Sequence, residues 1–153
     1  MDQYDPFCMK ENTDKTIFYD TRHFMVLYDI KPVVPGHILF VPKRHVVDIL
    51  ELSLDELRDF YSTLHHVIPR ILTLYEATEN SYDLTSQIGP YSGRTVPHLH
   101  IHLLPRQSGD KYQGLDENIF NDIKMNKTSA TYKDVNVQIE RLRKEFRYKE
   151  QTK

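Results

Sequence analysis

The chain has 153 residues, which is enough for one domain with a hydrophobic core and too short for two ordinary ones. Its hydrophobic fraction of 39%, charged fraction of 27% and net charge of -2 are typical of a globular protein. A wide nucleic-acid surface would need a basic excess, so we expect no nucleic-acid partner. Apolar runs long enough to span a bilayer are missing from the sequence, which argues against a membrane partner as well.

The sequence has one cysteine, Cys8, so neither an intrachain disulfide nor a CxxC zinc motif can form. The first fifteen residues are polar and acidic, and they resemble neither a signal peptide nor a transit peptide. These features favour a reducing compartment. We therefore expect a cytoplasmic protein, with the nucleus as a second location.

The first half of the chain predicts three strands. TIFYD (16–20) and HFMVLYDI (23–30) are rich in aromatic and β-branched residues and predict a β-hairpin. KPVVPG (31–36) interrupts the sheet because its two prolines cannot donate to a central ladder. HILFV (37–41) then predicts a third short strand.

The clearest helix follows these strands. Ser53 and Glu56 form the spacing of a capping box, which marks a helix start. Apolar residues then recur every three or four positions from Leu57 to Tyr75, as they do on one face of a helix. Pro69 lies inside this pattern and is expected to kink the helix or split it.

The second half predicts two more strands, at 82–89 and at VPHLHIHLLP (96–105). From about residue 107 to 130 the composition turns polar and favours a mobile loop, with a short helix at LDENIFNDIK (115–124). A charged helix is predicted over about 133–148.

This order of elements predicts one α+β domain over residues 1–153. We expect a mainly antiparallel sheet of about five strands, with a central helix and a C-terminal helix set against it.

Three histidines in the last predicted strand draw attention. His98, His100 and His102 alternate with aliphatic residues, so a strand places them on one face, about 7 Å apart. They could be polar side chains on a wet face, although Lys, Glu and Thr serve that purpose better. They could bind zinc, but the outer two lie roughly 13 Å apart, so a ligand from elsewhere, such as His37, would be needed.

The alternate spacing of His98, His100 and His102 fits nucleophilic catalysis better than either of these readings. A central imidazole can attack phosphorus, while its two neighbours hold oxyanions and the leaving oxygen. The loop GPYSGRT (89–95) just before the histidines offers glycines, hydroxyls and backbone N–H groups for an anion, which alone is a weak signal. We therefore favour a catalytic histidine cluster and keep a zinc site as the second hypothesis.

Three segments together resemble the histidine triad family of nucleotide hydrolases and transferases. They are HLHIHLL (98–104), KPVVPGHILFVPKRH (31–45) and SQIGPYSGRTVPHLHIHLLPR (86–106). The last is similar in particular to the fragile-histidine-triad branch, the dinucleoside polyphosphate hydrolases. The match runs from about Ile17 to Arg106, which is most of the chain.

The resemblance implies a role for each matching position. It implies that His100 is the nucleophile, His98 its supporting neighbour and His37 the outer histidine that buttresses it. His102 would contact the phosphates, and Gln87 would lie near the bridging oxygen of the scissile bond. The implied substrate contacts are Asp29 for the ribose, Leu27, Leu39 and Phe7 for the base, and the backbone of Gly93, Thr95 and Val96 for the phosphates.

Four positions depart from the branch. Asp29 replaces an expected asparagine, Ile88 an aspartate, Arg94 a glutamine and Phe120 a tyrosine. An aspartate still accepts from both ribose hydroxyls, and Arg94 adds positive charge near a long polyphosphate. These changes leave the chemistry intact and leave the preferred chain length of the substrate open.

The resemblance implies an enzyme that cleaves diadenosine triphosphate to AMP and ADP through a covalent nucleotidyl-histidine. A divalent cation, Mg²⁺ or Mn²⁺, would arrive with the nucleotide, and we expect no tightly bound metal. The family also implies a homodimer whose two sheets join into one. Two alternatives remain: a nucleoside phosphoramidase or adenylyl hydrolase of the related branch, and a nucleotide-binding signalling module.

Overall fold

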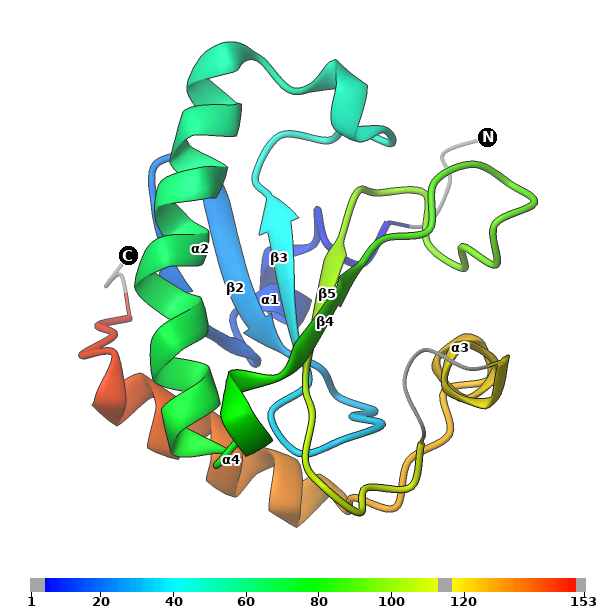
Figure 1. The fold of residues 1–153 in the computed structure, drawn as a ribbon. Coiled ribbons are helices and arrows are strands. Elements are labelled where there is room, and N and C mark those ends of the chain that lie inside the picture. The colour runs from blue at the N-terminus through cyan, green and yellow to red at the C-terminus, as the bar shows by residue number, and fades with distance from the viewer. Residues whose placement is uncertain (1–4, 113–116, 151–153) are drawn as a thin grey trace.

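The computed structural model describes residues 5–112 and 117–150 (Figure 1). A five-stranded sheet lies at its centre, with the order β1-β2-β3-β5-β4 and antiparallel pairing between all neighbours. The strands are β1 (Ile17–Asp20), β2 (Phe24–Tyr28), β3 (Ile38–Pro42), β4 (Tyr82–Thr85) and β5 (Ile101–Pro105). The predicted α+β class and antiparallel sheet are confirmed.

Four α-helices and two 3-10 turns occur in the described part of the chain. They are α1 (Lys10–Thr13), η1 (Ile49–Glu51), α2 (Leu54–Leu74), η2 (Thr78–Asn80), α3 (Glu117–Lys124) and α4 (Tyr132–Glu145). Within residues 5–112 and 117–150, none of the helices combines the length and the apolar character needed to cross a bilayer.

The long helix α2 begins as its sequence predicts. The Ser53 side chain accepts from the backbone of Glu56, and the Glu56 side chain accepts from the backbone of Ser53. Of the two effects expected of Pro69, a kink or a split of this helix, the split is wrong, because α2 runs through Pro69 unbroken, and the kink stays a prediction. Pro69 lies on the exposed side of the helix, where the carbonyl that loses its helical partner can be hydrated.

The hydrophobic core lies between one face of the sheet and two helices. Alternate strand residues such as Val26, Phe40 and Leu103 point into it. They meet the inner face of α2 and the side of α4 that carries Val135, Ile139, Leu142 and Phe146. Because both helices cover the same face, the other face of the sheet is left for a site.

Several predicted boundaries need correction. The segment 96–105 becomes a strand only at Ile101, because Leu99 donates to Val46 in the loop after β3 rather than to a neighbouring strand. The strand β4 ends at Thr85 rather than at 89, and the C-terminal helix ends at Glu145 rather than at 148. The predicted helix within 115–124 is present as α3, while residues 115 and 116 lie outside the described residues.

Candidate active site

The open face of the sheet carries a row of side chains across three strands. Leu27 of β2 pairs with Leu39 of β3, and Leu39 pairs with His102 of β5. Directly paired residues share a face, so the two leucines and the imidazole form one floor. They line a cavity of about 540 Å³.

This cavity brings together residues that are far apart in the sequence. Eleven of the twelve predicted site residues line it: Phe7, Leu27, Asp29, His37, Leu39, Gln87, Gly93, Thr95, Val96, His100 and His102. The exception is His98, which is fully buried behind the cavity wall. The predicted residues therefore share one site, and their individual roles remain predictions.

A single hydrogen bond sets the reactive form of His100. Its Nδ1 lies 2.7 Å from the backbone carbonyl oxygen of His98, which can only accept. Nδ1 therefore carries the proton, and Nε2 keeps the lone pair. Burial lowers the pKa of His100 below its ordinary value of 6.5, although the bond to His98 opposes this effect. The ring is therefore neutral at pH 7 and can act as a nucleophile through Nε2.

His98 is held by oxygen atoms on both sides of its ring. Its Nε2 lies 2.9 Å from the carbonyl oxygen of Pro42, and its Nδ1 lies 2.8 Å from the carboxylate of Asp5. Burial would raise the pKa of Asp5, but hydrogen bonds with Cys8, His98 and His45 outweigh burial and lower that pKa to about 2. The ionised carboxylate thus fixes the ring of His98, whose carbonyl in turn orients His100.

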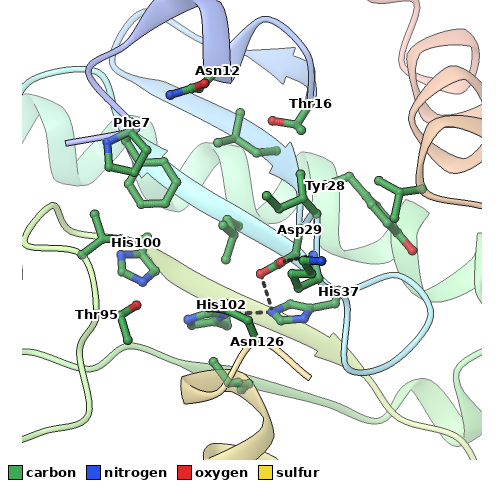
Figure 2. A pocket seen from close by; sticks show the side chains of 18 of the residues that line it. Phe7, Asn12, Thr16, Tyr28, Asp29, His37, Thr95, His100, His102 and Asn126 are labelled. Carbon is green, nitrogen blue, oxygen red and sulfur yellow. Dashed lines mark hydrogen bonds and ion pairs between the residues drawn. The ribbon is translucent and has the colours of Figure 1, made fainter. Parts of the chain in front are cut away.

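A second chain of hydrogen bonds sets the tautomer of His102. The backbone N–H of Val33 donates to Nδ1 of His37, so the proton of the neutral His37 ring lies on Nε2. This Nε2 lies 2.8 Å from Nδ1 of His102 and donates to it (Figure 2). The proton of His102 must then lie on its own Nε2. Burial lowers the pKa of both histidines, that of His37 to about 3, so both rings are neutral.

The N–H of His102 is available to a ligand. Among the described residues, Nε2 of His102 is the one buried side-chain nitrogen or oxygen atom that lacks a hydrogen-bond partner. A buried donor without a partner is costly, and an anion in the adjoining cavity would satisfy it. His37 therefore buttresses His102, and its hydrogen bond is not directed at His98 or His100.

Asp29 lies at the end of β2, opposite His37. Its backbone N–H donates to the carbonyl of His37, and its carboxylate lies 3.3 Å from Nε2 of the same residue. The other carboxylate oxygen accepts from the backbone of Lys31. Burial raises the pKa of Asp29, and the bond to Lys31 opposes this effect. Asp29 therefore lines the cavity, and its carboxylate also lies against the ring of His37.

The apolar end of the cavity is closed by a segment before the sheet. The ring of Phe7 lies 5.2 Å from that of His100 and 5.6 Å from that of His98, between centroids. It packs against the cluster that contains Leu27 and Leu39. The result is an apolar end of the cavity beside His100, lined by an aromatic ring and two leucines.

The loop between β4 and β5 forms the polar rim. Ser86 donates to the carbonyl of His100 over 2.7 Å, which ties the start of the loop to the nucleophile's backbone. Gln87, Gly93 and Arg94 follow on the rim. The positive charge of Arg94 adds to the effects that lower the pKa of His100.

Some site residues were missed by sequence reasoning. Asn12 and Thr16 also line the cavity, and Asp5 and His45 meet behind it. Asp5 lies 93 positions from His98, its partner. No motif or periodicity links residues at that separation, so the contact between Asp5 and His98 could be found only in the folded chain.

Within residues 5–112 and 117–150, two groups of side chains place enough ligand atoms together to hold a metal ion. In one, ligand atoms of Asp5, Cys8, His45 and His98 lie within 4.8 Å of one another. In the other, Asp29, His37 and His102 meet the same limit. The hypothesis of one ion held by two triad histidines and His37 does not fit the described residues, because His37 is grouped with His102 alone of the triad and His98 belongs to the other group.

The fold and the site together define a class of protein: an antiparallel sheet with three alternating histidines, of which His100 and His102 line a cavity on the open face and His98 is buried behind it. A model of the HIT domain family matches residues 10–109. The bifunctional bis(5'-adenosyl)-triphosphatase/adenylylsulfatase of Arabidopsis thaliana is 37% identical over 109 residues, 67% of this chain and 59% of that protein. The bis(5'-adenosyl)-triphosphatase of Saccharomyces cerevisiae is 38% identical over 91 residues, 59% of this chain and 43% of that protein.

A solved structure agrees with the match to the HIT domain family. The NitFhit protein of C. elegans superimposes with a TM-score of 0.66 and 28% identity, over 85% of this chain and 27% of that one. The chain belongs to the histidine triad (HIT) family. It spans about half the length of the curated relatives it matches.

Proposed function

We propose that the protein is a hydrolase of dinucleoside polyphosphates that cleaves diadenosine triphosphate to AMP and ADP. The observation that carries this proposal is the pair of fixed tautomers: His100 offers a lone pair on Nε2, and His102 offers an N–H on Nε2. A nucleophile beside an unpartnered donor suits attack on a phosphoryl group. The names of the relatives, which include two triphosphatases, support the same substrate class.

In the first step, Nε2 of His100 attacks the α-phosphorus. A P–N bond forms, the P–O bond to the bridging oxygen breaks, and ADP leaves with that electron pair. The His98 carbonyl accepts a hydrogen bond from Nδ1–H of His100 throughout this step. It therefore stabilises the positive charge that develops on the imidazole of His100. His102 donates to a phosphate oxygen, and Gln87 lies on the rim where the bridging oxygen would leave.

In the second step, water attacks the same phosphorus. The P–N bond breaks, its electron pair returns to Nε2, AMP leaves, and the proton of the water passes to solvent. The apolar slot of Phe7, Leu27 and Leu39 would hold adenine, and Asp29 would accept from the ribose.

We propose that a divalent cation, Mg²⁺ or Mn²⁺, arrives on the polyphosphate and that the protein holds no metal tightly. Every bond that forms or breaks in the proposed steps joins phosphorus to Nε2 of His100 or to an oxygen of substrate or water, so no step needs a metal held by the protein. Elemental analysis of the purified protein tests it, and the cluster of Asp5, Cys8, His45 and His98 is where a metal would be sought. One equivalent of zinc that resists dialysis would overturn the proposal.

We also propose a homodimer in the cytoplasm, with the nucleus as a second location. β4 is an edge strand, and Tyr82 and Leu84 on it are exposed. Leu54, Leu57 and Tyr61 on α2 are exposed as well. Covering these apolar side chains would favour association. Light scattering after size-exclusion chromatography should give twice the mass of the chain, and a monomer at micromolar concentration would contradict the dimer.

The function is tested by product analysis. The protein is incubated with diadenosine triphosphate, diadenosine tetraphosphate or adenosine phosphoramidate, and the products are resolved by chromatography. We expect AMP and ADP from the first substrate, faster than any product from the others. Faster cleavage of the phosphoramidate would instead support the phosphoramidase alternative, and no turnover of any substrate would support a binding module.

The pH dependence provides a separate check. A lowered pKa means that His100 takes up its inactivating proton only at a pH below its ordinary 6.5. The kcat/KM for diadenosine triphosphate should therefore decline on the acid side with a midpoint below pH 6.5. Initial rates from pH 5 to 9 measure this, and a midpoint at or above 6.5 would contradict a neutral, buried nucleophile.

A further inference from the structure

A second hollow adjoins the catalytic cavity on the side of α3. Its volume is about 720 Å³, and it shares Gln87, Gly93, Ile123 and Lys124 with the catalytic cavity. The loop between β4 and β5 forms one wall, and α3 forms the other, with Phe120 among its lining residues. Figure 1 shows α3 next to β4 and β5, below the loop that joins them. The two hollows therefore meet along Gln87 and Gly93.

The wall formed by α3 is anchored from its inner side. Ile119 is fully buried in a cluster with Leu104 of β5. The hydroxyl of Tyr112 donates to the carboxylate of Asp122 over 2.6 Å. Because Leu104 is two positions from His102 on β5, this anchor places α3 beside the triad. Other side chains of α3 remain to line the hollow.

The chemistry of the proposed substrate explains why a second hollow is useful. A dinucleoside polyphosphate carries a nucleoside at each end, and the residues assigned above to base and ribose in the catalytic cavity account for one of them. With phosphorus at His100 and the base beside Leu27 and Leu39, the leaving half must continue past the rim. Gln87 and Gly93 form that rim, and the second hollow begins there.

We propose that this second hollow binds the leaving half of the substrate, a nucleoside diphosphate or a longer nucleoside polyphosphate. The ammonium group of Lys124, at the edge shared by both hollows, contacts the leaving phosphates. The half-buried ring of Phe120 offers a surface on which a base can stack, and the exposed amide of Asn121 offers hydrogen bonds to its edge. This inference rests on the proposed function, because it assumes a substrate with two nucleosides.

Two substrates separate this subsite from the catalytic cavity. Diadenosine triphosphate has a leaving nucleotide, whereas adenosine phosphoramidate loses only ammonia and cannot use the second hollow. Lys124→Ala should lower kcat/KM for diadenosine triphosphate by about tenfold, the loss expected for one charge-assisted hydrogen bond. The loss with the phosphoramidate should be smaller, because it has no leaving nucleotide for Lys124 to contact, and Asn121→Ala, which changes a residue of the second hollow alone, should leave kcat/KM for the phosphoramidate within about twofold. Lys124→Arg should restore most of the loss because the charge is kept.

Matched variants control for charge and for the folding of α3. Lys127→Ala removes an exposed cation three residues further on that lines neither hollow, and it should leave both rates unchanged. Asn121→Ala should lower only the rate with diadenosine triphosphate, and circular dichroism should show the same helix content in every variant. Equal losses with both substrates, or no loss with either, would overturn the subsite. If the wild type turned over the phosphoramidate but not the dinucleotide, the proposed function itself would have failed.

Discussion

His100→Asn should abolish turnover and leave the fold and the bound nucleotide in place. The asparagine amide can still donate to the His98 carbonyl that now accepts from Nδ1, but it has no atom in the position of Nε2. Loss of a catalytic nucleophile costs roughly 10⁴-fold or more in kcat. We expect diadenosine triphosphate hydrolysis to fall by that amount, as measured by chromatography. Calorimetry should give a Kd close to that of the wild type for a non-hydrolysable analogue.

A direct trap completes this test. Rapid quenching of the wild type in alkali, followed by peptide mass spectrometry, should locate an adenylyl group on the peptide that contains His100, and His100→Asn should show none. His65→Asn, which changes an exposed histidine on α2, is the control and should retain full activity. An adduct on His98 or His102, or wild-type turnover without any adduct, would exclude the covalent mechanism.

Two chains of hydrogen bonds, one between His98 and His100 and one from Val33 through His37 to His102, explain why similar imidazoles can have different tasks. A carbonyl oxygen beside Nδ1 of His100 forces its proton to that side, which makes the other side a base and nucleophile. An N–H beside Nδ1 of His37 has the opposite effect, and through His37 it makes the cavity side of His102 a donor. Backbone groups therefore decide which imidazole is the nucleophile and which is the donor. Desolvation lowers the pKa of His100 and of His102 and keeps both rings neutral.

Much of the fold could be predicted because its signals are local. The capping box of Ser53 and Glu56 and the alternation of Leu99, Ile101 and Leu103 with histidines depend on residues close in sequence. The ends of β4 and β5 could not be predicted, because a strand ends where its neighbour stops pairing. β5 pairs with β3 only from Ile101, opposite Phe40, onward, because Leu99 donates instead to Val46 in the loop after Pro42.

The site, like the fold, has a part that the sequence predicts and a part that only the folded chain shows. The histidine triad and the block around His37 are visible in the sequence as motifs, so the residues lining the cavity could be predicted by resemblance. The partner of each imidazole could not, because hydrogen-bond direction depends on atoms such as the Val33 N–H and the Asp5 carboxylate. For this reason the sequence placed His37 behind the nucleophile, whereas the structure places it behind His102.

Gly36→Ala should destabilise the protein and disturb the hydrogen bond between His37, the next residue, and His102. Gly36 has a φ of +84°, and a Cβ there would lie 2.7 Å from Cγ of Tyr75 and 3.0 Å from Cγ of Pro105. Backbone strain in the left-handed region and overpacking against a buried ring together should cost about 2–4 kcal/mol. Urea unfolding should show this loss as a lower midpoint with an unchanged slope.

Gly109→Ala provides the matched control, because Gly109 has a similar φ of +80° but no atom within 4 Å of its Cβ position. It should show the backbone strain alone, about 1 kcal/mol. Because the backbone of Gly36 leads directly into His37, its displacement should also weaken the bond to His102 and lower kcat, whereas Gly109→Ala should leave kcat unchanged. If Gly36→Ala and Gly109→Ala lost equal stability, Tyr75 would have moved away from the added methyl group. Packing against Tyr75 would then not be the reason that residue 36 is a glycine.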